Sequence, residues 1–444
     1  MNKIFIYIIC SFVFISFLTL QDGGGNAASR FATVKALVRE NSFKINHFYT
    51  ETNDWAKNQN GDYYSNKAPG GALFAYPFYL LLEKGFKIED DSIKANVVSI
   101  MTQALPFLIF TILLLYLIQK LNISKSAQIF LLMSVLFANT ASLLINVYMG
   151  HTLAAGLVLG FIYFTYKNNW KLSGFLMAVA VCAEYSTLFL LPAVLAYTYL
   201  IEKNEFKERI LNLLVGASMP LIFFFSYHYF VFGGVFTLPH TQVTDVMEYV
   251  DSTQKGHLSS ILHFVPNFWI LHQLIWSLNR GILFTQPWLL FILLWIPFKG
   301  FKVIRGFGFQ KALMAFSFFG FLGVYYMNAC FPGWHGGSSP GPRYLSVIFP
   351  VIGVFSALVY DLLSVRMQKF LWILLCISLV FRALVAGASV LPPMDGFLWS
   401  WYLDQLIEGT FSHGLVKFFV TLILILMTFY LNHYFKDRTS RATP

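Results

Sequence analysis

The sequence predicts an all-α polytopic membrane protein with about twelve membrane crossings. The chain is 57% hydrophobic and only 12% charged, with a mean hydropathy of +0.62, far from the average of soluble domains. Long apolar runs such as 104–118 carry no charged residue. The basic residues lie in short clusters between these runs, as the positive-inside rule requires, so the formal net charge of +10 is explained without a nucleic-acid partner.

The expected spans are apolar runs bounded by charged or turn-forming residues. The first follows Lys3 and is interpreted as a transmembrane helix because no small-residue cleavage signature follows it. In chain order the spans are Ile4–Leu20, Val97–Ile118, Ile129–Tyr148, Leu153–Tyr166, Leu172–Ile201, Ile210–Phe232, Ile282–Phe298, Ala312–Cys330, Tyr344–Leu363, Phe370–Ala388 and Leu415–Phe435.

The segment Leu172–Ile201 decides the topology because it is too long for one ordinary helix. A single crossing would place the basic loops that follow it on the outer side. Two crossings, with a turn near Glu184, place every short basic loop and both termini in the cytoplasm. We therefore expect a multi-pass protein of the plasma (inner) membrane.

This topology gathers the polar loops on the extracytoplasmic face of a single domain spanning 1–444. The first loop, 21–96, includes an apolar segment, 71–82, that is too short to span and contains Pro77, which predicts an interfacial helix. Further outer loops are expected at 233–281 and 331–343, and a second interfacial segment at 257–277.

Two aspartates in the first outer loop are candidate general bases. Asp22 directly follows the first span, at the membrane surface, and is followed by three glycines that allow close backbone approach to a ligand. Asp54 lies in Thr-Asn-Asp-Trp-Ala. The alternatives are that Asp22 simply ends the first helix and that Asp54 caps a short helix.

Three cations are candidate ligands for a phosphate. Lys67 precedes Ala-Pro-Gly, a turn that fixes the direction of its ammonium group. Arg343 ends a loop dense in glycine and proline, and Arg280 begins a span from the same side. Arginines at outer ends run against the positive-inside tendency, so each is expected to face an anion, either a phosphate or an acidic side chain.

Further polar residues are candidates for substrate binding. Tyr64 and Ser65 can offer hydroxyl groups beside Lys67, while His151 and Glu184 are ionisable groups at the outer ends of spans. Both may instead be read as hydrogen-bonded interface residues. The four cysteines have no metal-ligand spacing and are expected to be inert packing residues.

Several stretches resemble the GT-C superfamily of membrane glycosyltransferases, in particular bacterial relatives of protein O-mannosyltransferases and aminoarabinose transferases. They are Ser29-Arg30-Phe31-Ala32, Asn53-Asp54-Trp55-Ala56, Tyr63 through Gly70, Asn279 through Phe284 with Pro287-Trp288, and Trp334 through Tyr344. The resemblance extends over most of the chain.

The resemblance implies an inverting transfer from a polyprenyl-phosphate sugar. It implies a catalytic carboxylate near the end of the first span, matched in position by Asp22, and a lysine before proline facing the donor phosphate, matched by Lys67. The usual second acid after the first span is missing, which leaves the base open between Asp22 and Asp54. Arg30, Asn26, Trp334 and His335 lie in or near the matching stretches and are expected to bind substrate.

The expected function is therefore sugar transfer from a polyprenyl-phosphate donor to a hydroxyl group of a protein, lipid or glycan acceptor at the extracytoplasmic face. No certain cofactor is implied, and a divalent metal stays open. The alternatives are a transporter, a flippase for lipid-linked glycans, or a ligase that joins whole glycans. A transporter typically has broken helices near the midplane, whereas here the polar residues lie in outer loops.

Overall fold

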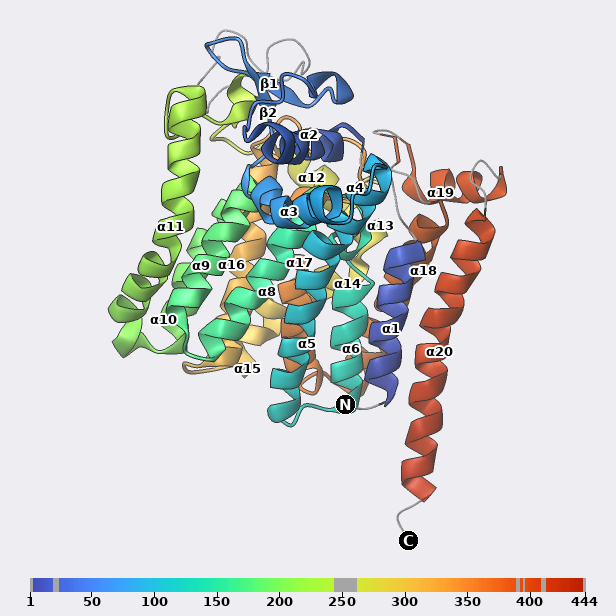
Figure 1. Ribbon diagram of the computed structural model, residues 1–444. Coiled ribbons are helices and arrows are strands. Elements are labelled where there is room, and N and C mark those ends of the chain that lie inside the picture. The colour runs from blue at the N-terminus through green and yellow to red at the C-terminus, as the bar shows by residue number, and fades with distance from the viewer. Residues whose placement is uncertain are drawn as a thin grey trace.

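The computed structural model describes residues 3–18, 24–242, 262–388, 392–393, 396–408 and 413–441. In these residues the chain is a bundle of helices with a single short two-stranded hairpin. Figure 1 shows long helices side by side, a layer formed by α2, α3 and the hairpin across one end, and both chain termini towards the other end.

The α-helices have the following bounds: α1 Lys3–Leu18, α2 Gly24–Glu40, α3 Gly70–Leu80, α4 Asp91–Ser99, α5 Leu105–Lys120, α6 Lys125–Leu136, α7 Thr140–Leu143, α8 His151–Tyr166, α9 Trp170–Ala183, α10 Leu191–Ile201, α11 Phe206–Phe232, α12 Phe268–Trp276, α13 Ile282–Thr285, α14 Pro287–Trp295, α15 Phe301–Val303, α16 Phe309–Ala329, α17 Phe349–Tyr360, α18 Val365–Ala388, α19 Leu398–Ile407 and α20 Gly414–Arg441. The strands are β1, Trp55–Lys57, and β2, Tyr63–Ser65.

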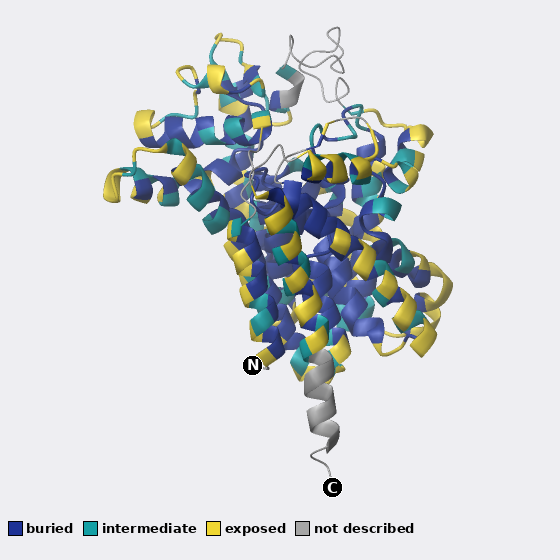
Figure 2. Ribbon diagram, turned by 90° about the vertical axis from the view of Figure 1, so that its right-hand side faces the viewer, coloured by how far each residue is buried: buried dark blue, intermediate teal, exposed yellow. Residues whose placement is uncertain are grey.

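The exterior of the bundle identifies it as a membrane protein. Five helical segments in the described residues are long and apolar enough to cross a membrane: 91–120, 203–232, 309–329, 365–388 and 414–431. Large apolar side chains point outwards, with Met219 73% and Phe230 81% exposed on α11. Figure 2 shows this exposed exterior around a buried interior. Such a surface is stable in lipid and not in water.

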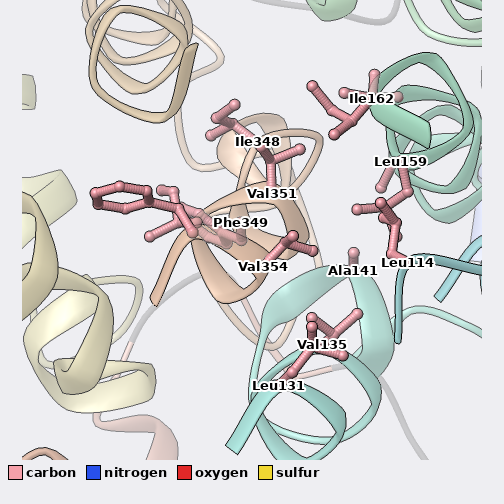
Figure 3. Packing of buried hydrophobic residues seen from close by; sticks show 14 of the residues in the cluster. Leu114, Leu131, Val135, Ala141, Leu159, Ile162, Ile348, Phe349, Val351 and Val354 are labelled. Carbon is pink, nitrogen blue, oxygen red and sulfur yellow. The ribbon is translucent and has the colours of Figure 1, made fainter. Parts of the chain in front are cut away.

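The interior is packed with aliphatic and aromatic side chains from helices distant in sequence. Figure 3 shows Leu114 of α5, Leu131 of α6, Leu159 of α8 and Val351 of α17 directed towards one another. All four are fully buried. Tight packing of this kind fixes the relative positions of the helices that carry the polar layer.

The predicted turn near Glu184 is present. Helix α9 ends at Ala183, a 3-10 segment covers Tyr185–Leu190, and α10 follows. The guanidinium of Arg209, at the start of α11, lies 4.9 Å from the ring centroid of Trp170, at the start of α9. Because α11 directly follows α10, both ends of the α9–α10 segment lie at the same end of the bundle, as a hairpin requires.

The span expected at Ile129–Tyr148 is wrong in its second half, since α6 ends at Leu136. The fully buried Asn139 breaks the helix, because its side-chain amide donates to the carbonyls of Ser134 and Val135. Its side-chain oxygen accepts from the backbone N–H of Ser142, which starts the short helix α7.

The first outer loop is more ordered than its polar sequence suggested. Residues 24–40 form α2, and the interpretation of Asp54 as a helix cap is wrong, because Asp54 leads into β1. The short apolar segment around Pro77 is helical, as expected, and forms α3. Of the segment 257–277, residues 257–261 lie outside the described residues, and α12 covers Phe268–Trp276.

Candidate active site

The hairpin brings Asp54 and Lys67 together. Trp55 pairs with Ser65 in the antiparallel register, so the residue before β1 lies opposite the residues that follow β2. The hairpin turn is stabilised by Asn58, whose side-chain oxygen accepts from the backbone N–H groups of Asn60 and Asp62. Local turn chemistry therefore sets the position of two candidate site residues.

Asp54 and Lys67 form a buried ion pair, with 3.1 Å between Oδ2 and Nζ. Asn66 donates from Nδ2 to the other carboxylate oxygen at 3.4 Å. Burial alone would raise the pKa of Asp54, but Lys67, with smaller contributions from Arg343 and Asn66, holds it below its ordinary value of 3.8. Asp54 is therefore ionised at neutral pH, as a general base must be.

Hydroxyl groups join the hairpin to α2. The Ser29 hydroxyl donates to the backbone carbonyl of Asp54 at 2.5 Å and lies 2.6 Å from the Ser65 hydroxyl. The Ser65 oxygen accepts from the backbone N–H of Lys67 at 3.2 Å. Ser65, a predicted substrate ligand, is placed here as part of this connection and is buried.

A second buried ion pair lies deeper, between Arg30 of α2 and Glu184 at the α9–α10 turn. Their Nη2 and Oε2 atoms are 3.2 Å apart, and His151 Nδ1 lies 3.5 Å from the same carboxylate oxygen. Arg30 also donates to the side chain of Asn26 and to the carbonyl of Ala183. The structure thus brings together four predicted residues from distant segments.

Gly150 makes this approach possible. It has a positive φ of 83°, and a Cβ there would lie 2.8 Å from the Ala183 carbonyl oxygen and 2.9 Å from Arg30 Nη1. A side chain at position 150 would therefore displace the guanidinium group that meets Glu184.

Arg343 is a buried cation of a different kind. Within the described residues it forms no ion pair, although it is only 8% exposed. Its Nη1 lies 3.5 Å from Met149 Sδ, and its guanidinium lies 5.3 Å from the ring centroid of Tyr344. Its charge nevertheless acts on Asp54, whose pKa it helps to lower. A buried guanidinium without a carboxylate partner is suited to an anionic ligand.

Arg280 braces the loop that ends in Arg343. Its guanidinium donates to the carbonyls of Ser339, Gly337 at 2.8 Å and Pro393 at 3.1 Å. In the same loop, the Gly337 N–H donates to His335 Nδ1, and the ring of Trp334 meets that of Trp269 edge to face. These predicted residues hold the shape of the loop rather than lying beside Asp54.

An apolar cavity of about 340 Å³ ends at this group of charges. Its walls come mainly from α11 and the turn after α9, including Leu188, Phe189 and Phe224. Glu184 and Tyr344 also line it, so one part of the cavity is polar while most of its wall is hydrocarbon. Such a cavity suits a ligand with an apolar chain and a polar head group.

The other predicted residues have distinct placements. Asp22 lies outside the described residues. Tyr64 is buried in the hairpin against Phe232, with ring centroids 5.7 Å apart. In the part of the chain that the structure describes, no three His, Cys, Asp or Glu side chains gather as metal ligands would.

Four residues at the site were not singled out from the sequence: Ser29, Asn66, Met149 and Tyr344. Three of them stand next to predicted residues in the same short motifs. The Asn60-Gly61 turn between two short aromatic stretches was an available signal for the hairpin, and hence for the proximity of Asn66 to Asp54.

No protein-family model and no curated protein sequence matches the chain. Its structure is similar to two structures of an oligosaccharyltransferase from Archaeoglobus fulgidus. The apo form has a TM-score of 0.53 and 10% identity, and AglB in complex with an inhibitory peptide and a dolichol-phosphate has 0.51 and 11%. Each match covers 94% of this chain and 59% of the archaeal chain, so the protein spans under two thirds of that length.

A third similar structure is ArnT from Cupriavidus metallidurans in the apo state, with a TM-score of 0.50 and 12% identity. This match covers 96% of the chain and 75% of ArnT. At such low identities the likeness concerns the fold. The chain has the helical membrane fold of the GT-C glycosyltransferases, as its motifs led us to expect.

Proposed function

We propose that this protein transfers a sugar from a polyprenyl-phosphate donor to an acceptor hydroxyl group at the extracytoplasmic face of the plasma membrane, with inversion at the anomeric carbon. The observation that carries this proposal is Arg343. It is a buried cation without a carboxylate partner among the described residues, next to the polar part of an otherwise apolar cavity.

The donor class follows from the pairing of charges. Lys67 is matched by Asp54, and Arg30 by Glu184, so Arg343 supplies an unmatched positive charge among the described groups. A lipid phosphate supplies the complementary negative charge, and its hydrocarbon chain matches the apolar wall. The AglB complex, which contains a dolichol-phosphate, shows that a related fold binds a ligand of this chemical class.

In the proposed reaction, Asp54 accepts the proton of the acceptor hydroxyl as its oxygen attacks the anomeric carbon. The bond from that carbon to the phosphate oxygen breaks, and polyprenyl phosphate leaves with the bonding electrons. Lys67 and Arg343 stabilise the negative charge on the leaving phosphate. Asp22 is the alternative base. Arg30, Glu184 and His151 hold α2 against the α9–α10 turn.

The test is a transfer assay on purified protein in lipid, with Arg343→Ala compared to Arg305→Ala. Arg305 is an exposed arginine in the loop before α16 and serves as the matched control. Loss of a charged hydrogen bond to the donor is worth about 1.5–3 kcal/mol, so the KM for the donor is expected to rise by roughly 10- to 150-fold in Arg343→Ala only. An unchanged donor KM would show that Arg343 does not bind the phosphate.

A further inference from the structure

A polar cavity on a different face of α2 has no part in the reaction described above. Its volume is about 520 Å³, within the range of small-molecule sites. Ala27, Ala28 and Phe31 line it from α2, Asn96 lines it from α4, and Tyr148 closes it from the segment before α8.

The charged groups at this cavity neutralise one another. Lys35 Nζ lies 2.7 Å from Glu51 and 2.8 Å from Asp91, and both carboxylates line the cavity with it. Asp91 also pairs with Arg39 and Lys94, which in turn share Glu83, so three cations meet three carboxylates. An anionic ligand would find no unmatched cation in this network, and a cationic one no unmatched carboxylate.

The remaining lining combines aromatic rings with amides and hydroxyl groups. The rings of Phe31 and Tyr148 lie 4.5 Å apart, and Tyr79 donates to Asp91 at 3.0 Å. Asn96 and Ser92 add polar groups on α4. Rings that offer a flat apolar face, next to many donors and acceptors, match the alternating C–H and O–H surface of a sugar.

The cavity lies close to both ion pairs of the site. A Cβ at Gly71 would be 3.2 Å from Arg30 Nη1 and 3.9 Å from the Tyr148 hydroxyl, so these two side chains share one neighbour. A Cβ at Gly25, two residues before Ala27, would be 3.6 Å from the Asp54 carboxylate. The first turn of α2 therefore borders the cavity on one side and Asp54 on another.

We propose that this cavity binds an uncharged carbohydrate portion of the acceptor, so that the protein glycosylates a glycan. The proposal rests on the glycosyl transfer proposed above and narrows its acceptor from protein, lipid or glycan to the last. The apolar cavity beside Glu184 takes the donor, the polar cavity takes the acceptor sugar, and the start of α2 separates them.

The binding test uses methyl glycosides of glucose, galactose, mannose and N-acetylglucosamine with the corresponding disaccharides, and a neutral serine-containing peptide as the competing class. Saturation-transfer NMR on protein in nanodiscs measures their affinities. Ala28→Phe fills the cavity from α2, and Ala95→Phe fills it from α4. Ala196→Phe, at a half-buried alanine of α10 that lines neither cavity, is the matched control.

We expect at least one glycoside to bind the wild type, at least tenfold weaker binding in both filling variants, and unchanged binding in Ala196→Phe. In transfer assays the acceptor KM should rise by a similar factor while the donor KM stays constant. Absence of binding across the panel, equal binding in folded filling variants, or binding of the peptide alone would overturn the proposal.

The two proposals fail in different ways. Asp54→Asn should bind glycosides like the wild type while its transfer rate falls. If the wild type binds glycosides but consumes no polyprenyl-phosphate sugar, the proposed function is wrong and the sugar site stands. If it transfers sugar but the filling variants keep their acceptor KM, the sugar site is wrong and the proposed function stands.

Discussion

At the scale of single residues, the account depends on the different tasks of two neighbouring charges. Asp54 and Lys67 neutralise each other in the structure, yet the proposed reaction needs both: the carboxylate to accept a proton and the ammonium to face the leaving phosphate. Their mutual contact keeps both groups charged in a buried place, where either alone would tend to be neutral.

Replacement of Asp54 by Asn should remove the base while nearly preserving its shape. Positioned general bases contribute roughly 10²- to 10⁴-fold to rate, so kcat should fall by that factor. Asp62→Asn is the matched control, since Asp62 is an aspartate of the same hairpin that pairs with Lys44 at the surface. Steady-state transfer rates of both variants provide the measurement. Full activity in Asp54→Asn would transfer the role to Asp22.

The pH profile should be broad on its acid side and limited on its alkaline side. The pKa of Asp54 lies below 3.8, so the base stays ionised, and activity persists, as pH falls towards that value. Burial lowers the pKa of Lys67 below 10.5, against the opposing effect of Asp54. The lysine therefore loses its proton, and the phosphate its partner, at a lower pH than an exposed lysine would.

Lys67→Arg isolates this effect, because arginine keeps its charge throughout. The rate between pH 7 and 10.5 should fall in the wild type and stay level in Lys67→Arg, at a lower maximum because the guanidinium is larger. Identical alkaline limbs in the two proteins would assign the fall to another group.

At the scale of elements, breaks in helices position the site as much as the helices do. The α9–α10 turn presents Glu184, and the break after α6 leads into the segment that carries Met149 and His151. Asn139 makes the second break, and no hydrophobic periodicity reveals it because the residues on both sides are apolar.

Asn139→Ala should destabilise the protein more than Asn169→Ala. Both asparagines cap a helix, but Asn139 is buried and also donates to two carbonyls, whereas the Asn169 side chain accepts one backbone N–H. Loss of a cap costs about 1 kcal/mol, and each buried carbonyl left unpaired costs about 1–3 kcal/mol more. Thermal unfolding in detergent should show the larger fall in Tm for Asn139→Ala. Equal falls would contradict this role of the buried amide.

The sequence allowed prediction of features that depend on composition over many residues. The α9–α10 break followed from a thirty-residue apolar segment and the positions of basic loops, and the interfacial segment at α3 from its length and Pro77. Helix α2 was missed because its polar residues and leading glycines suggested a loop, although 26–40 contains no glycine or proline. The pairing of Asp54 with Lys67 depends on strand register, and that of Arg30 with Glu184 on packing across 154 positions.

At the scale of the whole molecule, the bundle separates its charges into two ends. The layer formed by α2, α3 and the hairpin lies at one end, and the junction of α10 and α11 lies at the other, near both termini (Figure 1). The positive-inside rule places the second end in the cytoplasm.

Cysteine labelling tests this orientation. Asn60→Cys, at the exposed hairpin turn, should react with a membrane-impermeant maleimide added to intact cells. Asn204→Cys, between α10 and α11, should react only after the membrane is opened, provided that the segment 172–201 crosses twice. The wild type corrects for its own four cysteines. Reaction of Asn204→Cys in intact cells would exclude the double crossing.

The most direct test of the central claim is transfer of a radiolabelled sugar from polyprenyl phosphate by the purified protein in lipid vesicles, with wild type and Lys67→Ala compared. The wild type should form a covalent glycosylated product, and folded Lys67→Ala should form at least about 100-fold less, because an electrostatic contact to the leaving phosphate is lost. Equal transfer by the two proteins, or uptake of label by the wild type without any covalent product, would contradict the account.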